Sequence, residues 1–126
     1  MTGSSPIVTA DEIFAIDKNI RWVGLVTSKG EVVLNKMRPG VQSYSPSSID
    51  EDFLRLGPLT LLGVEERYSK YLRGVQEIVV HYGVTLSVYA RLGSQVIAIS
   101  IEEDHPEAVS TVREWLRKKK QELGNA

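Results

Sequence analysis

The chain has 126 residues, and its hydrophobic content of 42% and charged content of 25% are typical of one globular domain. Its 15 basic and 16 acidic residues give a net charge of −1, which excludes an overall positive field that would attract nucleic acid or anionic lipid. The absence of cysteine excludes disulfides, thiolate catalysis and cysteine-ligated metal centres.

The chain begins with a short polar segment, a short helix and a strand. Residues 1–8 lack a basic or apolar leader pattern, so we expect a disordered N-terminus in a cytoplasmic protein. Thr9 and Glu12 have the spacing of a capping box, which predicts a helix after Thr9. Residues 20–27 predict a central strand with helices on both faces, since both alternating sets are largely apolar: Ile20, Trp22, Gly24 and Val26, and Arg21, Val23, Leu25 and Thr27. Residues 31–36 are its expected hairpin partner.

A long middle helix follows a serine-rich loop. Ser48 is a candidate N-cap, and Asp50, Glu51 and Asp52 carry the charge that a helix N-terminus favours. We expect the helix to continue towards residue 73 and to end at Gly74. Pro58 predicts either a kink or two helical segments.

The last part of the sequence predicts an antiparallel meander and a final helix. Strands are expected over residues 75–82, 84–92 and 95–102, and glycines mark the turns between them. The strand over 95–102 is apolar on both sides, which predicts a second central strand. Pro106 opens a helix that has one apolar face made of Val109, Val112, Leu116 and Leu123. The order α-β-β-α-β-β-β-α predicts a three-layer α/β/α sandwich with a five-stranded antiparallel sheet. We expect one domain over residues 9–123 and a tail over 124–126.

This order of elements resembles roadblock and longin-like domains, within the broader profilin-like group, over residues 9–123. A narrower similarity, to small uncharacterised archaeal proteins of the ammonia-oxidising lineage, is carried by Ile16-Asp17, Ile20-Arg21, Gly24, Gly30, residues 37–41, residues 55–59 and Tyr71-Leu72. The resemblance to roadblock domains implies a non-enzymatic homodimer or heterodimer that scaffolds or regulates small GTPases and motors.

Several polar groups have both a chemical and a structural interpretation. Residues 102–105, Glu-Glu-Asp-His, carry possible ligands for a divalent cation, but adjacent side chains diverge, and an acidic helix N-terminus is the favoured interpretation. Asp50, Glu51 and Asp52 are similarly interpreted as solvated acids rather than an acid–base pair. His81 lacks an identifiable nucleophile, and Arg38 beside Pro39-Gly40 is weak evidence for anion binding. The basic residues 117–120 suit a helix C-terminus better than a nucleic-acid groove. We therefore predict no catalytic residue, cofactor or metal.

The remaining signal is an excess of apolar residues on the middle helix and on the strand after it. Leu61 and Leu62 diverge by about 100° on a helix, so one can face the core and the other a partner. In the profilin-like arrangement that the resemblance implies, the strand that contains Gln76, Ile78, Val79 and Val80 lies at a sheet edge, which invites pairing with another chain. We predict a non-catalytic interaction or regulatory module that forms a homodimer or binds another protein. The alternatives are that the leucines fold over the monomer core, or that the protein is a small-ligand sensor with a pocket between sheet and middle helix.

Overall fold

The computed structural model describes residues 5–44 and 47–124, with the side chains of these residues except 47–53 and 55. The elements are α1 (Ala10–Phe14), β1 (Ile20–Thr27), β2 (Val32–Met37), α2 (Ser47–Leu72), β3 (Ile78–His81), β4 (Thr85–Leu92), β5 (Gln95–Glu102) and α3 (Glu107–Glu122). The five strands form one antiparallel sheet with the order β2-β1-β5-β4-β3. The predicted order of elements and fold class are confirmed.

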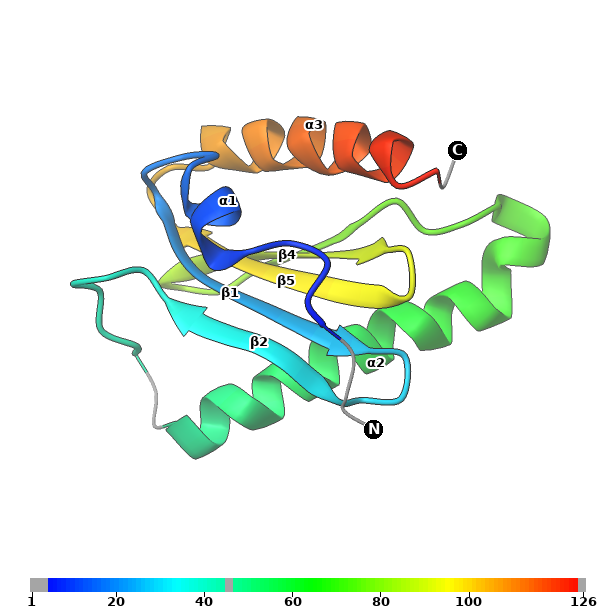
Figure 1. Cartoon of the computed structure of the whole chain (residues 1–126), viewed down its shortest axis with the longest axis horizontal. Coiled ribbons are helices and arrows are strands. Elements are labelled where there is room, and N and C mark those ends of the chain that lie inside the picture. The colour runs from blue at the N-terminus through cyan, green and yellow to red at the C-terminus, as the bar shows by residue number, and fades with distance from the viewer. Residues whose placement is uncertain (1–4, 45–46, 125–126) are drawn as a thin grey trace.

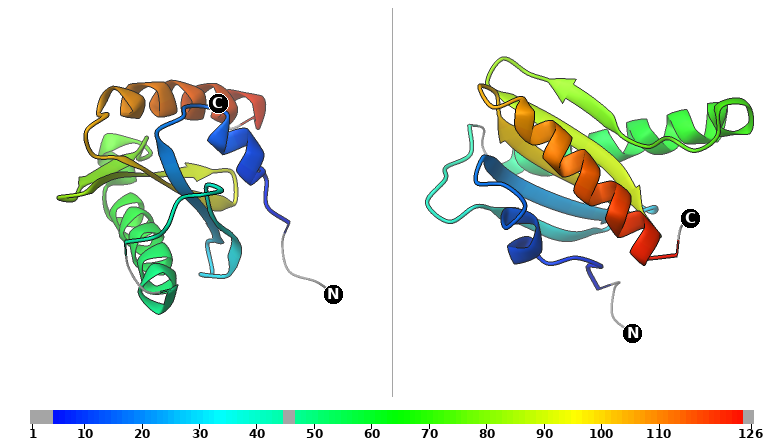
Figure 2. Two further views of the ribbon diagram at one scale, coloured as in Figure 1. Left: turned by 90° about the vertical axis from the view of Figure 1, so that its left-hand side faces the viewer. Right: turned by 90° about the horizontal axis from the view of Figure 1, so that it is seen from above.

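The sheet separates two helical layers. α1 and α3 lie on one face and α2 crosses the other (Figure 1), and two further views show the same layers (Figure 2). β1 and β5 are hydrogen-bonded neighbours inside the sheet and are buried over most of their length. This confirms the prediction that both are central strands covered on each face.

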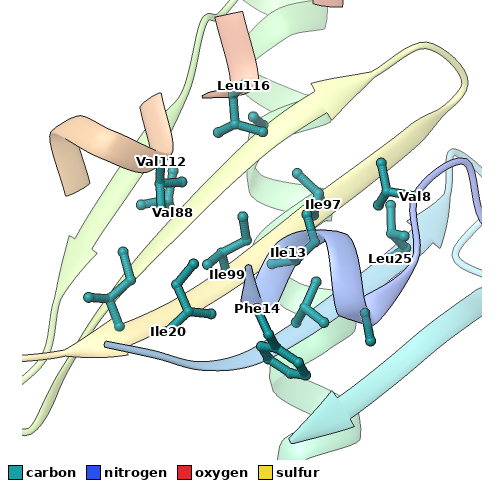
Figure 3. Close-up of a cluster of buried hydrophobic side chains, with 14 of the residues drawn as sticks. Val8, Ile13, Phe14, Ile20, Leu25, Val88, Ile97, Ile99, Val112 and Leu116 are labelled. Carbon is teal, nitrogen blue, oxygen red and sulfur yellow. The ribbon is translucent and has the colours of Figure 1, made fainter. Parts of the chain in front are cut away.

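Each layer has its own hydrophobic core. In the first core, side chains of α1 and α3 such as Ile13, Val112 and Leu116 pack on alternate residues of β1, β4 and β5, including Ile97 and Ile99 (Figure 3). The second core lies between α2 and the opposite face of the sheet, and its buried members are Trp22, Val26, Leu54, Leu61, Tyr89, Val96 and Ala98. Burial of apolar area on both faces, at about 25 cal/mol per Å², stabilises the fold.

A β-bulge at the start of β1 changes the expected alternation. Ile20 pairs with Ile101, whereas Trp22 pairs with Ser100, so Arg21 is an extra residue on β1. Ile20 is therefore buried in the first core and Trp22 in the second. The prediction that both lie on one face is wrong, because a bulge shifts the period of two by one residue.

Helix α2 is continuous through Pro58, so the two-segment form that the sequence suggested there is wrong. The residue that turns the chain after the helix is Arg73, with a φ of 68°, and not Gly74 as expected. The side chains of Ser48, Asp50, Glu51 and Asp52 lie outside the described part of the chain. None of the described helices has a stretch long and apolar enough to cross a bilayer.

Both ends of the described chain differ from expectation. The Ile7 amide donates to Gln95 Oε1 at 3.1 Å and Val8 is buried in the first core, so the expected disordered segment does not extend to residue 8. Residues 1–4 lie outside the described part. Leu123, expected on the apolar face of the last helix, follows the end of α3 and is exposed.

Candidate interaction surface

Strand β3 forms one edge of the sheet, as predicted, because it pairs only with β4 among the described strands. It is shorter than expected and begins at Ile78, so Gln76 precedes it in the connection from α2. Ile78 and Val80 point towards the α2 layer and are half-buried against the second core. Val79 points to the opposite face and is 43% exposed. A partner that contacts Val79 and the α2 layer together must therefore approach along the β3 edge.

The two adjacent leucines of α2 both point towards the protein. Leu61 is fully buried in the second core and Leu62 is half-buried against it, so Leu61 is not available to a partner. The outward side of α2 instead exposes other large apolar side chains, namely Leu56, Leu59, Val64, Tyr68 and Tyr71. The sequence predicted no interface role for the two tyrosines, although residues 64, 68 and 71 repeat at helical spacing.

The C-terminal end of α2 extends beyond the sheet (Figure 1; Figure 2). Tyr71 and Leu72 in this last turn are 75% and 74% exposed. Leu72 is exposed although it follows Leu54 and Leu61 by a whole number of helical turns, because the sheet does not reach it. We use the name α2–β3 surface for Leu56, Leu59, Val64, Tyr68, Tyr71, Leu72 and the β3 edge with Val79.

The acidic residues 102–105 contact separate partners. Glu102 Oε1 lies 2.5 Å from Arg21 Nη1, while Glu103 Oε2 is 3.9 Å from His81 Nε2. His105 Nδ1 lies 2.9 Å from Glu107 Oε2, and this hydrogen bond raises the pKa of His105. Among the described residues, no three His, Asp or Glu side chains are grouped so that they could hold a metal ion.

The Arg38 guanidinium binds the backbone of this chain. Its Nε donates to Ile20 O at 2.6 Å, and its Nη2 donates to Phe14 O at 2.8 Å and Asp17 O at 2.7 Å. The guanidinium also lies 5.0 Å from the centroid of the Phe14 ring. Arg38 therefore ties the end of α1 to the start of β1, which explains this arginine without a bound anion.

The basic residues near the end of α3 also have protein partners. Arg117 donates to Glu114 at 2.6 Å, and Lys119 lies 3.4 Å from Glu12. Lys120 Nζ donates to Gln76 O at 2.7 Å, and partial burial lowers the pKa of this lysine. The Lys119 and Lys120 contacts hold α3 to neighbouring segments, whereas the Arg117 contact lies within the helix. No such contact is described for Lys118.

Comparisons with known proteins identify the fold. No protein-family model matches the chain, and no curated protein matches it. The solved structure of the gliding protein MglB from Thermus thermophilus is similar over 100% of both chains, with a TM-score of 0.68 and 14% identity. A roadblock/LC7 domain from Streptomyces avermitilis covers 89% of this chain and 93% of its own, with a TM-score of 0.60 and 13% identity. MglB of Myxococcus xanthus covers 94% and 100%, with a TM-score of 0.62 and 11% identity. The chain therefore has a roadblock-like fold.

Proposed function

We propose that this chain is a non-catalytic interaction and regulatory module that forms a homodimer through the α2–β3 surface. The observation that carries the proposal is the row of exposed apolar side chains on α2, which adjoins an open sheet edge. Contiguous apolar surface and unpaired strand edges are both features that proteins cover with a partner. Leu62, Gln76, Ile78, Val79 and Val80 belong to this proposed interface, and Leu61 supports it from within the core.

The geometry explains how two copies can cover both features together. Antiparallel pairing of two β3 edges extends the sheet across the interface, and backbone hydrogen bonds set its register. The same approach brings two α2 helices together on one face of the extended sheet. Leucine and tyrosine side chains there lose exposed apolar area, at about 25 cal/mol per Å². One of the structures with this fold is described as MglB with tetrameric arrangement, so self-assembly is compatible with the fold.

Light scattering tests the homodimer. We expect a mass of twice the 14.0 kDa chain at tens of micromolar protein. Val79→Glu on the β3 edge and Leu59→Glu on α2 should each give the single-chain mass, because burying an unpaired charge costs several kcal/mol. Leu123→Glu is the matched control, since Leu123 is exposed outside the α2–β3 surface, and it should stay dimeric. Circular dichroism shows whether each variant is folded; a single-chain mass for the wild-type protein contradicts the homodimer.

We further propose a small GTPase-like protein as the regulated partner, which rests on the resemblance to roadblock domains. The test measures GTP hydrolysis by purified small GTPases from the same organism, with and without the wild-type chain. A changed rate that the Leu59→Glu variant fails to reproduce supports this partner. Unchanged hydrolysis rates for all of the GTPases would contradict a GTPase partner, while the mass measurement would still decide the homodimer.

The similarity to archaeal proteins stays a prediction.

A further inference from the structure

A pocket of about 250 Å³ lies on the α2-facing side of the sheet, at the end where β1 begins and β5 finishes. Its lining includes Arg21, Trp22, Tyr44, Tyr82, Ser87 and Ser100. They come from β1, β4, β5, the loop after β2 and the β3–β4 turn. All of the described lining residues belong to the sheet and its loops, while the side chains of residues 47–53 and 55 of α2 lie outside the described part of the chain.

The floor of the pocket is polar and adjoins the apolar part of the same sheet face. Ser87 and Ser100 are directly paired on β4 and β5, and Trp22 is paired with Ser100 from the other side. The next pair along the same face is Tyr89 and Ala98, which belong to the second core. On the other side of the two serines, the next pair on this face is Thr85 and Glu102, so the apolar part of the sheet face ends in polar groups at the pocket.

The Ser87 hydroxyl is the strongest sign of a binding function. Ser87 is 1% exposed, and its Oγ has no hydrogen-bond partner among the described residues. The hydroxyl lies near enough to the Tyr89 phenol to affect the pKa of that group, but without the geometry of a hydrogen bond. A buried hydroxyl left without a partner destabilises a protein, so a side chain of this kind in a pocket lining points to a group that binds there.

Aromatic side chains form the walls and the rim. Trp22 is buried, and its Nε1 donates to Asn35 Oδ1 at 2.8 Å, which fixes the orientation of the indole ring. Tyr44 and Tyr82 are 62% and 39% exposed, and Val84 beside them is 53% exposed. Exposed apolar side chains thus surround the opening of a pocket whose deepest residues are buried. Flat aromatic walls favour a flat ligand.

Arg21, the charged side chain of the described lining, already has partners. The Arg21 guanidinium is paired with Glu102, donates to Gln42 O at 2.8 Å and stacks on Tyr44 at 4.2 Å from the ring centroid. An anionic ligand would have to compete with Glu102 for the guanidinium. The electrostatics therefore favour a neutral ligand over a carboxylate or phosphate.

We propose that this pocket binds a neutral, flat and largely apolar small molecule whose single polar group hydrogen-bonds to Ser87. The volume sets its size: a cavity of about 150 Å³ takes benzene, and drug-sized ligands need about 300–1,000 Å³. A pocket of about 250 Å³ fits one ring with a short polar substituent. All of the described lining residues belong to one chain, so the proposal does not rest on the proposed dimer.

Benzamide is a suitable probe, because it is flat and neutral and its amide both donates and accepts hydrogen bonds. Amide NMR signals of the ¹⁵N-labelled full chain are followed during titration with benzamide and with benzoate, its anionic counterpart. We expect saturable shifts for benzamide at residues 87 and 100, and weaker binding of benzoate. Tyr44→Ala should weaken benzamide binding because it removes an exposed wall, and Val79→Glu should leave it unchanged.

Ser87→Ala separates a binding role from a structural one. Losing one hydrogen bond should weaken benzamide binding by about two- to tenfold. The melting temperature of the ligand-free variant should rise, because a buried hydroxyl without a partner is removed. Ser94→Ala, in the exposed turn between β4 and β5, is the matched control and should change neither quantity. Absence of saturable benzamide binding, equal binding by Ser87→Ala, or a lower melting temperature of that variant would overturn the proposal.

Discussion

The ring of Tyr89 lies directly against the backbone of Gly57, so a Cβ at position 57 would overlap the ring. The contact joins α2 to β4 at the centre of the second core. Tyr89 is 3% exposed, so its ring has little room to move away. Burial, with a smaller contribution from Tyr82, raises the pKa of the Tyr89 phenol, which therefore stays neutral. This close approach sets the spacing between α2 and the sheet.

Gly57→Ala should destabilise the protein. Overpacking costs about 1–3 kcal/mol, and the higher helix propensity of alanine returns about 1 kcal/mol, so we expect a net loss of up to about 2 kcal/mol. Gly63→Ala in the same helix is the control, because a Cβ there meets no atom within 4 Å. It should gain about 0.5–1 kcal/mol. Urea unfolding measures both, and a Gly57→Ala variant as stable as the wild type would contradict the contact.

Arg38→Lys should destabilise the protein although the charge is kept. The planar guanidinium reaches the carbonyls of Phe14, Asp17 and Ile20 at once, and a lysine ammonium cannot reproduce that geometry. We expect a loss of about 1–3 kcal/mol, since hydrogen bonds to charged groups contribute about 1.5–3 kcal/mol each and lysine retains some of them. Lys36→Ala on exposed β2 should stay within about 0.5 kcal/mol of the wild type. Equal unfolding midpoints for Arg38→Lys and the wild type would show that the guanidinium hydrogen bonds to these carbonyls do not stabilise the protein.

Glu102→Gln and Glu103→Gln should differ although the residues are neighbours. Glu102 pairs with Arg21, whose side chain is 11% exposed, whereas Glu103 lies 3.9 Å from a well-exposed His81. Removing the Glu102 charge leaves a nearly buried guanidinium with a weaker partner, so we expect a loss of about 1–3 kcal/mol. The Glu103 change should be within about 0.5 kcal/mol. Thermal unfolding compares them, and equal melting temperatures would contradict the importance of the Arg21 pair.

His105 should titrate above its ordinary pKa of 6.5, because its hydrogen bond to Glu107 favours the charged imidazolium. A raised pKa in the folded state means that this contribution to stability is complete below pH 6.5. It is lost as the pH rises through the folded-state value. NMR titration of the imidazole protons should show the pKa falling towards 6.5 in Glu107→Gln. Asp104→Asn should have a smaller effect, and an unchanged pKa in Glu107→Gln would contradict the hydrogen bond.

The sequence predicted the elements whose signals are local or periodic. The Thr9 and Glu12 side chains form the predicted capping box, since its partners are three residues apart. Residues 20–27 and 95–102 are central strands because both of their alternating sets are apolar. The edge position of the strand around Val79 was implied by the resemblance to profilin-like domains.

The candidate interface was only partly predictable. Helical periodicity indicated that the apolar residues of α2 exceed what one face of a sheet can cover. It left open which of Leu61 and Leu62 faces the core, a place that Leu61 takes, and it did not predict the exposure of Tyr71 and Leu72. Which apolar residues stay exposed depends on where the sheet ends beneath the helix, and that limit is set by strands distant in sequence.

Only the tertiary structure decided which distant groups meet. The bulge at Arg21 puts Ile20 and Trp22 in different cores and brings Arg21 to Glu102, 81 residues away. The hydrogen bond from Arg38 to the Ile20 carbonyl, and the position of the unpartnered Ser87 hydroxyl, likewise depend on strand register. The periodicity of a strand or helix decides on which face of that element a residue lies, relative to its neighbours in the chain. Its hydrogen-bond partners are set by the register between strands, which is a property of the whole packed sheet.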